Sequence, residues 1–179
     1  PTLTVDARSG NNIVKTLPAG IMSWSPNGKR LACSHFGSNS VRVLDTTTGQ
    51  QVLVRNGPAE FWTCGVAWSP DGSRVASTGP GVITIWDAAT GADVLTLRGH
   101  QDGCPIRCVA WSPDGKRLAS GGYEATVIIW DADDGHQLQT LVGHAGVVYA
   151  VAWSADGKRL ASVSADRTVR VWDPASGDE

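Results

Sequence analysis

The sequence has almost no excess of charge and no long apolar run. Its 15 basic and 17 acidic residues leave a formal net charge of −2, whereas nucleic acids and anionic membranes are bound through clustered basic residues. No apolar stretch is long enough to span a bilayer, and Pro1 to Asp6 lack the basic and then apolar layout of a signal peptide. We therefore expect a soluble, cytoplasmic protein that binds neither nucleic acid nor membrane. Pro1 in place of Met suggests a piece of a longer protein.

Cysteine is scarce, and its four copies do not resemble a disulfide framework or a metal site. Cys33, Cys64 and Cys108 stand where related segments of the chain carry Ser, Tyr or Val, which is typical of small buried side chains. Cys104 and Cys108 have a C-x3-C spacing with His100 nearby, but no second pair of ligands follows at a matching spacing. We expect no metal and no cofactor.

Catalytic signatures are also absent from the sequence. It contains no Gly-x-Ser-x-Gly and no glycine-rich phosphate loop. The paired acids Asp133 and Asp134 precede Gly135 in a turn, where Asp is favoured for its backbone hydrogen bonds rather than for acid-base work. We therefore predict a protein that is not an enzyme.

What the sequence does have is a repeat. The phrase Trp-Ser-Pro-Asp-Gly-Lys-Arg-Leu-Ala-Ser and its variants recur along the chain, followed by Leu-Asp in the first copy and by Trp-Asp in the other three. The first Trp of this cassette stands at intervals of 44, 43 and 42 residues, at Trp24, Trp68, Trp111 and Trp153. The second position is filled by Leu44, Trp86, Trp130 and Trp172. Self-similarity at this period indicates a repeat architecture.

One cassette predicts several short strands. Residues 147–153 form an apolar run rich in β-branched and aromatic residues, and the turn residues 154–157 end it. Residues 158–163 give a second strand, and residues 168–172 alternate with the two-residue period of a third. The preceding repeat adds a fourth strand at residues 138–142. Each period therefore holds four antiparallel strands.

These repeats resemble the WD-repeat family of β-propellers over nearly the whole chain. The resemblance is carried by Gly99-His100, Gly143-His144, the Trp-Ser-Pro-Asp-Gly turns, Trp86-Asp87, Trp130-Asp131 and Trp172-Asp173. It implies an all-β chain of four blades, each with four antiparallel strands. Blades of this type build rings of roughly seven or eight, so four blades make half a ring with two uncovered apolar faces.

The resemblance also implies a structural hydrogen-bonded tetrad inside each blade. Its members are the His of Gly-His, a Ser of the second strand, an acid in the next turn and the Trp of Trp-Asp. The two complete sets are His100, Ser120, Glu124 and Trp130 in the third repeat, and His144, Ser162, Asp166 and Trp172 in the fourth. Such a network is satisfied only when all members are present.

The first two repeats depart from this pattern. The second keeps Ser77 and Trp86 but has neither the His nor the acid, and the first has Cys33 for Ser and Leu44 for Trp, with no His before it. We therefore expect stability to rise from the N-terminus to the C-terminus.

The strand count predicts how the ring closes. Residues 12–17 resemble a fourth strand, whereas the last repeat stops at Trp172-Asp173 without one. We expect two chains to form an eight-bladed homodimeric ring, in which residues 12–17 of each complete the other's last blade. A segment of a longer chain, covered by its own neighbouring blades, is the competing explanation. The expected division of the chain is 2–17 N-terminal strands, 18–55, 56–97, 98–142 and 143–173 for the four repeats, and 174–179 as a tail.

In this family the resemblance implies binding on the face that carries the loop before each first strand and the turn after each second strand. The residues that this logic selects are Trp62, Cys64, Arg107, Tyr123, Tyr149 and Ala165. Trp, Tyr and Arg are enriched at interaction hot spots, although Phe61 and Trp62 could equally cover an incomplete blade. We expect a protein-interaction scaffold with partners of unknown identity. The alternatives are a propeller that binds small ligands or glycans, and a segment of a larger signalling protein.

Overall fold

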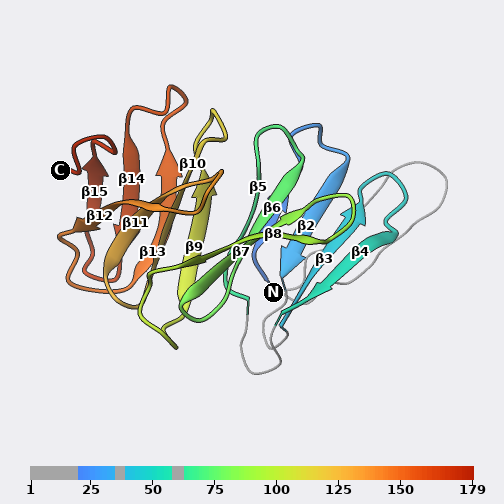
Figure 1. Ribbon diagram of the computed structural model, residues 1–179, viewed down its shortest axis with the longest axis horizontal. Coiled ribbons are helices and arrows are strands. Elements are labelled where there is room, and N and C mark those ends of the chain that lie inside the picture. Colours follow the sequence, from blue (N-terminus) through green and yellow to red (C-terminus); the bar gives the residue numbers. More distant parts are fainter. Residues whose placement is uncertain (1–19, 35–38, 58–62) are drawn as a thin grey trace.

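The computed structural model describes residues 20–34, 39–57 and 63–179, and these residues form fifteen strands. The strands make four antiparallel sheets in which strands adjacent in sequence pair with each other (Figure 1). The described part of the chain contains no helix with the length and apolarity to cross a bilayer. Each sheet is built from one sequence repeat, so we call the sheets blades 1 to 4 in chain order.

The bounds of the strands follow the repeats. Blade 1 contains β1 (Met22–Trp24), β2 (Arg30–Ser34), β3 (Ser40–Asp45) and β4 (Gln51–Asn56). Blade 2 contains β5 (Val66–Trp68), β6 (Arg74–Thr78), β7 (Val82–Asp87) and β8 (Asp93–Arg98). Blade 3 contains β9 (Ile106–Trp111), β10 (Arg117–Gly122), β11 (Thr126–Asp131) and β12 (Gln137–Val142). Blade 4 contains β13 (Val148–Trp153), β14 (Leu160–Ser164) and β15 (Val169–Trp172).

The cassette turn fixes the first hairpin of each blade. In blade 4 the Ser154 hydroxyl donates to Asp156 at 2.6 Å and accepts a hydrogen bond from the Arg159 main-chain nitrogen at 2.9 Å. Gly157 closes the turn with a φ of 68°, a left-handed conformation that glycine adopts without strain. The repeated phrase of the sequence is thus a β-hairpin turn whose polar groups are paired internally.

The strand register repeats from blade to blade. The Trp of Trp-Asp stands opposite an apolar residue of the second strand in each of the last three blades, as in Leu160 with Trp172. Blades 1 to 3 each shift register between their third and fourth strands, immediately before the Trp position. The bulge bends the outer strand at the same place each time.

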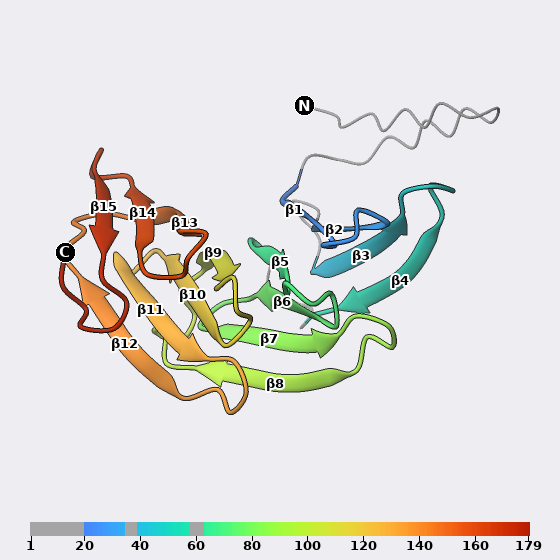
Figure 2. The same cartoon turned by 90° about the horizontal axis from the view of Figure 1, so that it is seen from above.

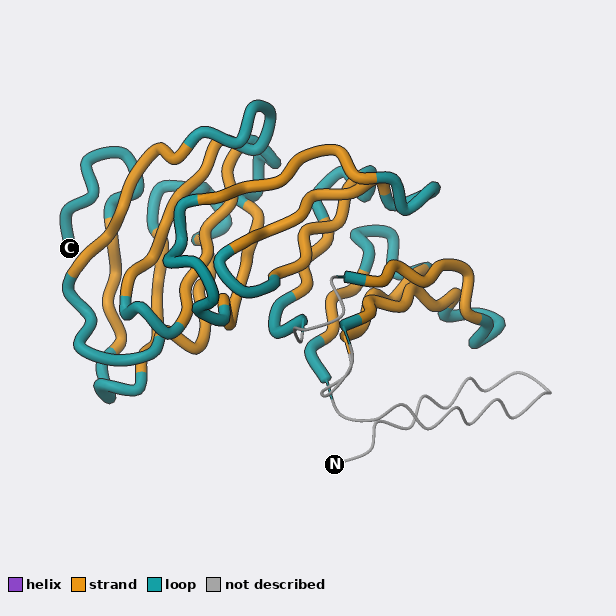
Figure 3. Tube along the Cα trace, turned by 60° about the horizontal axis from the view of Figure 1, so that its bottom comes forward, coloured by secondary structure: helices purple, strands orange, loops and turns teal. Residues whose placement is uncertain are grey.

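The four blades lie side by side in an open arc (Figure 2). The first strand of each blade lies on the inner side of the arc, and β4, β8 and β12 lie on the outer side. Turns and loops gather at the two ends of the strands (Figure 3). Residues far apart in sequence can therefore share one end of the arc.

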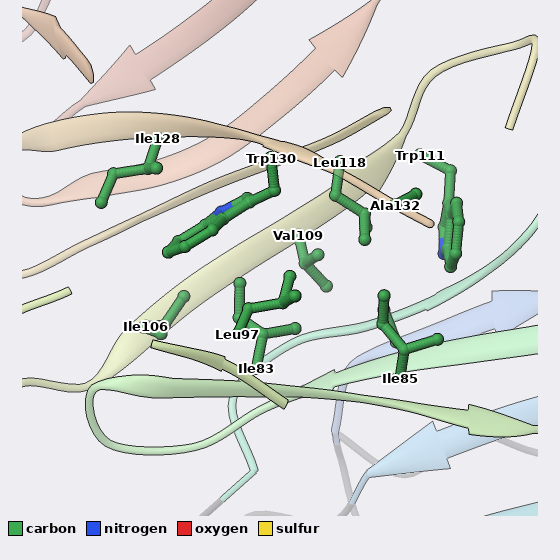
Figure 4. Close-up of a cluster of buried hydrophobic side chains, with 11 residues drawn as sticks. Ile83, Ile85, Leu97, Ile106, Val109, Trp111, Leu118, Ile128, Trp130 and Ala132 are labelled. Atoms are coloured by element: carbon green, nitrogen blue, oxygen red, sulfur yellow. The ribbon is translucent and has the colours of Figure 1, made fainter. Parts of the chain in front are cut away.

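Three hydrophobic clusters hold the arc together, one at each junction between neighbouring blades. Figure 4 shows the middle cluster, where Ile83 and Ile85 of blade 2 lie across from the blade 3 side chains and Ile85 faces Trp111. The aliphatic pair of the third strand is fully buried at this junction. Burial of apolar area between blades is thus the main force that sets their stacking.

The structure confirms the all-β class and the antiparallel blades that the repeat predicts. Blades 1 to 3 each have four strands, and blade 4 has three within the described residues. The closing strand that we expect at residues 12–17 lies outside the described residues. The four described blades do not form a closed ring (Figure 2).

Candidate functional site

Blade 4 contains a chain of hydrogen bonds that runs from its core to its surface. The Trp172 indole nitrogen donates to the Ser162 hydroxyl at 2.8 Å, and Ser162 lies 2.7 Å from Nε2 of His144. Nδ1 of His144 lies 2.8 Å from a carboxylate oxygen of Asp166. Thr168 also donates to Asp166, from its hydroxyl and from its main-chain nitrogen. The four residues that the resemblance selects are therefore in direct contact.

Blade 3 repeats this arrangement with Glu in place of Asp. The Trp130 indole nitrogen donates to Ser120 at 2.8 Å, and Nε2 of His100 lies 2.6 Å from the same hydroxyl. Nδ1 of His100 contacts Glu124, whose second oxygen accepts a hydrogen bond from the Gln101 main chain at 2.7 Å. The longer Glu side chain thus fills the role that Asp has in blade 4.

The hydrogen-bond partners of each histidine indicate one proton arrangement. The Trp indole can only donate, so the Ser hydroxyl accepts from it and has its own proton free for Nε2 of the His. Nδ1 then carries the ring proton and donates it to the carboxylate. Burial lowers the pKa of His100, which keeps its imidazole neutral. The Thr168 hydroxyl and main-chain donors hold the pKa of Asp166 well below its usual range.

The incomplete blades hold only fragments of this network. In blade 2 the Trp86 indole donates to Ser77 at 3.1 Å, and the chain supplies no histidine or acid there. In blade 1 Leu44 replaces the Trp, and the Cys33 thiol faces the Arg42 carbonyl at 3.5 Å. The hydrogen-bonded part of the core therefore lies in the C-terminal half of the chain.

Two of the expected binding residues meet across a junction between blades. The Arg107 guanidinium of blade 3 lies over the Tyr149 ring of blade 4, 5.8 Å from its centroid. Tyr149 is 52% exposed, and Tyr123 is equally exposed. The Tyr123 main-chain nitrogen donates to the Pro105 carbonyl at 3.3 Å, which places this tyrosine beside the strand that carries Arg107. Arg107, Tyr123 and Tyr149 are hereafter the aromatic-arginine surface.

The other expected binding residues differ in their positions. Ala165 is exposed at the same end of blade 4, and its main-chain nitrogen donates to Val147. Cys64, expected on this surface, is buried instead and only 8% exposed. The reason is the tight passage of the chain at Gly65, where an added Cβ would lie 3.0 Å from Thr78 and 3.4 Å from Cys108. Trp62 lies outside the described residues.

The cysteines and acids do not assemble into a second kind of site. No disulfide joins the four cysteines, and burial raises the pKa of the Cys108 thiol to about 12. No cluster of three His, Cys, Asp or Glu side chains that could hold a metal occurs in residues 20–34, 39–57 and 63–179.

Comparison with known proteins decides the family. The family model of the WD domain, G-beta repeat (WD40) matches residues 49–87, 91–131 and 135–173, which make up more than half of the chain. The chain belongs to the WD40 repeat family. WD40 repeats typically serve as protein-interaction scaffolds and are generally not catalytic. Their blades account for all four sheets of this structure.

One curated relative is similar to part of this WD40 chain. Anaphase-promoting complex subunit cdh1 of Dictyostelium discoideum is 32% identical over an alignment that covers 44% of this chain and 11% of that protein. The chain thus spans only a small part of the length of that relative.

Sequence reasoning missed the polar contacts that join one WD40 blade to the next. The Trp111 indole nitrogen donates to the Ala67 carbonyl of blade 2 at 3.2 Å, and Trp153 donates to Ala110 of blade 3 at 3.2 Å. In each case the acceptor is the residue before the cassette Trp of the preceding blade. The sequence signal is the Ala-Trp pair that recurs in the last three cassettes, but nothing local shows that a neighbouring blade uses the Ala carbonyl.

A repeated arginine makes the second type of inter-blade contact. Arg30 donates to the Ala88 carbonyl of blade 2 at 3.1 Å, and Arg74 donates to the Ala132 carbonyl of blade 3 at 3.0 Å. Each arginine is the first residue of the second strand of its blade. This arginine recurs at the same position of each cassette, so the sequence alone could have pointed to a shared structural role.

Two similar hollows lie between blades at the end opposite the aromatic-arginine surface. One, of about 460 Å³, is lined by residues of the cassette turns of blades 2 and 3, among them Asp71, Arg74 and Trp111. The other, of about 420 Å³, is lined by the equivalent turns of blades 1 and 2, with Arg30 and Trp68. Both are products of the repeat, since equivalent residues line them.

Proposed function

We propose that this WD40 chain is a non-catalytic scaffold that binds another protein through the aromatic-arginine surface. The observation that carries this proposal is the exposed contact between Arg107 and Tyr149, which come from two different blades. An arginine held over a tyrosine offers charge, hydrogen-bond donors and flat apolar area in one place. Residues of these types supply much of the energy at protein interfaces.

The role of the histidines supports a non-catalytic function. His100 and His144 are each less than one-tenth exposed, and both ring nitrogens of each are engaged within the blade networks. A general base needs access to its substrate's proton, which these imidazoles lack. The acids Glu124 and Asp166 are committed to the same networks.

The similarity to a subunit of the anaphase-promoting complex also supports an interaction role. That relative is, by its name, a component of an assembly. Since this chain covers little of its length, the similarity supports the class of function and not a shared partner.

The proposal is tested by comparing the proteins retained by the wild type and by two surface variants. We expect Arg107→Ala and Tyr149→Ala each to lose partners that the wild type retains, with unchanged denaturation midpoints. Lys158→Ala is the matched control, because Lys158 is an exposed residue of the turn at the opposite end of blade 4. If both surface variants retain every partner of the wild type, the proposed surface is wrong.

A second candidate function is the binding of a small ligand or glycan, because the two inter-blade hollows repeat. Each combines an indole with an arginine and carboxylates, which suit hydroxyl-rich ligands. Amide chemical shifts near Asp71, followed during titration with simple sugars, test this candidate. It fails if no sugar moves those signals at millimolar concentration.

We also propose that the half ring is completed by a second copy, as the strand count of the sequence predicts. Each copy has one uncovered face at each end of its arc, so two copies related by a two-fold axis would cover all four faces. The proposed division into repeats assigns residues 18–55, 56–97, 98–142 and 143–173 to the four blades. In this assembly residues 12–17 supply the outer strand beside β15.

A further inference from the structure

The internal junctions of the arc show what a complete junction contains. Its apolar part includes two aliphatic residues of the third strand, and the pair Val127 and Ile129 of blade 3 is fully buried against blade 4. Its polar part includes the indole hydrogen bond from Trp153 to Ala110. Arg117 also lies over the Trp153 ring, 4.7 Å from its centroid.

The face of blade 4 that is turned away from blade 3 offers one half of such a junction without a partner blade in the structure. Val169 and Val171 occupy the positions of the buried aliphatic pair, yet they are 65% and 49% exposed. Arg159, which has the position of Arg74, instead contacts Asp173 of its own blade at 3.2 Å, and its side chain is 59% exposed. This face therefore has the side chains of a junction in place but uncovered.

The face of blade 1 that is turned away from blade 2 offers the other half of the junction. Trp24 is 55% exposed, whereas its equivalents Trp68 and Trp111 are 7% and 9% exposed. Met22, two residues earlier on the same strand face, is 39% exposed, and its equivalent Val109 is 9% exposed. A large exposed indole beside an exposed Met indicates an interface, because a neighbouring blade buries the equivalent Trp in blades 2 and 3 and partly buries Trp153 in blade 4.

We infer that Trp24 of one copy docks on blade 4 of a second copy and reproduces the internal junction there. Its indole N–H would donate to the Ala152 carbonyl, because Ala152 precedes Trp153 as Ala110 precedes Trp111. Arg159 of the second copy would leave Asp173 and lie over the Trp24 ring, as Arg117 lies over Trp153. The inference rests on the proposed two-copy ring and names the residues that close it.

A second copy is the occupant that the geometry favours. The two half junctions are complementary, and they are carried by the first and last blades at opposite ends of one arc (Figure 2). The proposed contact is of the same kind as the three junctions inside the chain. A two-fold axis places each first blade against the other copy's last blade, so both junctions form at once.

Single variants test the two halves separately, with the mass in solution as the readout. We expect Trp24→Asp and Val171→Asp each to weaken dimer formation by roughly tenfold or more, because each damages both junctions of the ring. Val94→Asp is the matched control, since Val94 is also 49% exposed but lies on the outer strand of blade 2. It should keep the mass of the wild type.

Mixing the two damaged chains gives the decisive result. A ring that contains one chain of each kind has one intact junction, formed by the sound first blade of one and the sound last blade of the other. We therefore expect the mixture to recover dimer that neither variant forms alone. No recovery, or a Trp24→Asp chain that dimerises like the wild type, would overturn the assignment of these residues. If the Trp24→Asp chain dimerises like the wild type, the two-copy assembly stands but does not use this junction. A monomeric wild type would refute both the two-copy assembly and the junction.

Discussion

The Trp153 indole nitrogen of blade 4 donates a hydrogen bond to the Ala110 carbonyl of blade 3 at 3.2 Å. The same bond joins Trp111 to Ala67 one junction earlier. At the first junction the Trp68 main-chain nitrogen donates to the Ser23 hydroxyl, and the Trp68 indole nitrogen has no hydrogen-bond partner among the described residues. The polar part of the junctions is therefore more regular toward the C-terminus.

The serine at the centre of the blade 4 network is expected to contribute strongly to stability. Ser162→Ala removes the partner of both Trp172 and His144, and leaving buried polar groups unpaired costs about 1 to 3 kcal/mol. Ser77→Ala is the matched change in blade 2, where only Trp86 loses its partner. Denaturant titration should show a larger loss of unfolding free energy for Ser162→Ala. Equal losses would contradict the role given to the His144 branch.

The histidine of the same network should behave similarly. His144→Ala leaves the buried Ser162 hydroxyl without its acceptor, and we expect it to lower the free energy of unfolding by about 1 to 3 kcal/mol. A change within error of zero in the denaturant titration would show that the imidazole adds nothing to the stability of blade 4.

Local stability is expected to rise along the chain. Amide hydrogen exchange should be slower in β10 than in β6, since blades 2 and 3 both lie inside the arc and only blade 3 has the complete network. The same comparison between the end blades pairs β14 with β2. Faster exchange in β10 than in β6 would contradict this gradient.

Acid should destabilise the fold in two separate pH ranges. Burial lowers the pKa of His100, so the unfolded chain binds more protons below about pH 6.5, and stability falls as the pH drops through this range. The Ser69 and Ser73 hydroxyls lower the pKa of Asp71 to about 2. Its contribution is present above about pH 4 and is lost as the pH falls toward 2. Midpoints of urea unfolding measured across this pH range test both losses of stability. Asp71→Asn should reduce only the loss below about pH 4.

One turn of blade 3 carries backbone strain that a substitution can relieve. Ala125 has a φ of 61°, in the left-handed region that costs residues with a Cβ. Ala125→Gly should therefore raise the free energy of unfolding by about 0.5 to 1 kcal/mol, after the entropy cost of glycine. Ala155→Gly, in a turn without a positive φ at that residue, should be neutral or destabilising. If both variants lose stability equally, the strain at Ala125 is negligible.

The sequence predicted the parts of the structure that repeat within one blade. The repeated cassette predicted the strands of each period. The family resemblance identified the network of His144, Ser162, Asp166 and Trp172, which lies within a single sheet. The cassette turn was predictable for the same reason, because Ser154, Asp156 and Gly157 are close in sequence.

Contacts between blades were harder to predict, because they join residues more than forty positions apart. The bond from Trp153 to Ala110 and the stacking of Arg107 over Tyr149 depend on how two sheets are rotated against each other. The burial of Cys64 has the same origin, since the neighbouring blade closes over that part of the chain. A repeat pattern gives the period of such contacts but not their geometry.

Light scattering on the 179-residue chain tests most directly whether two half rings close on each other. With Trp24, Val169 and Val171 uncovered in a single arc, we predict a particle of twice the chain mass of 18.8 kDa at low micromolar concentration. A stable monomer of 18.8 kDa under the same conditions would contradict closure by a second copy.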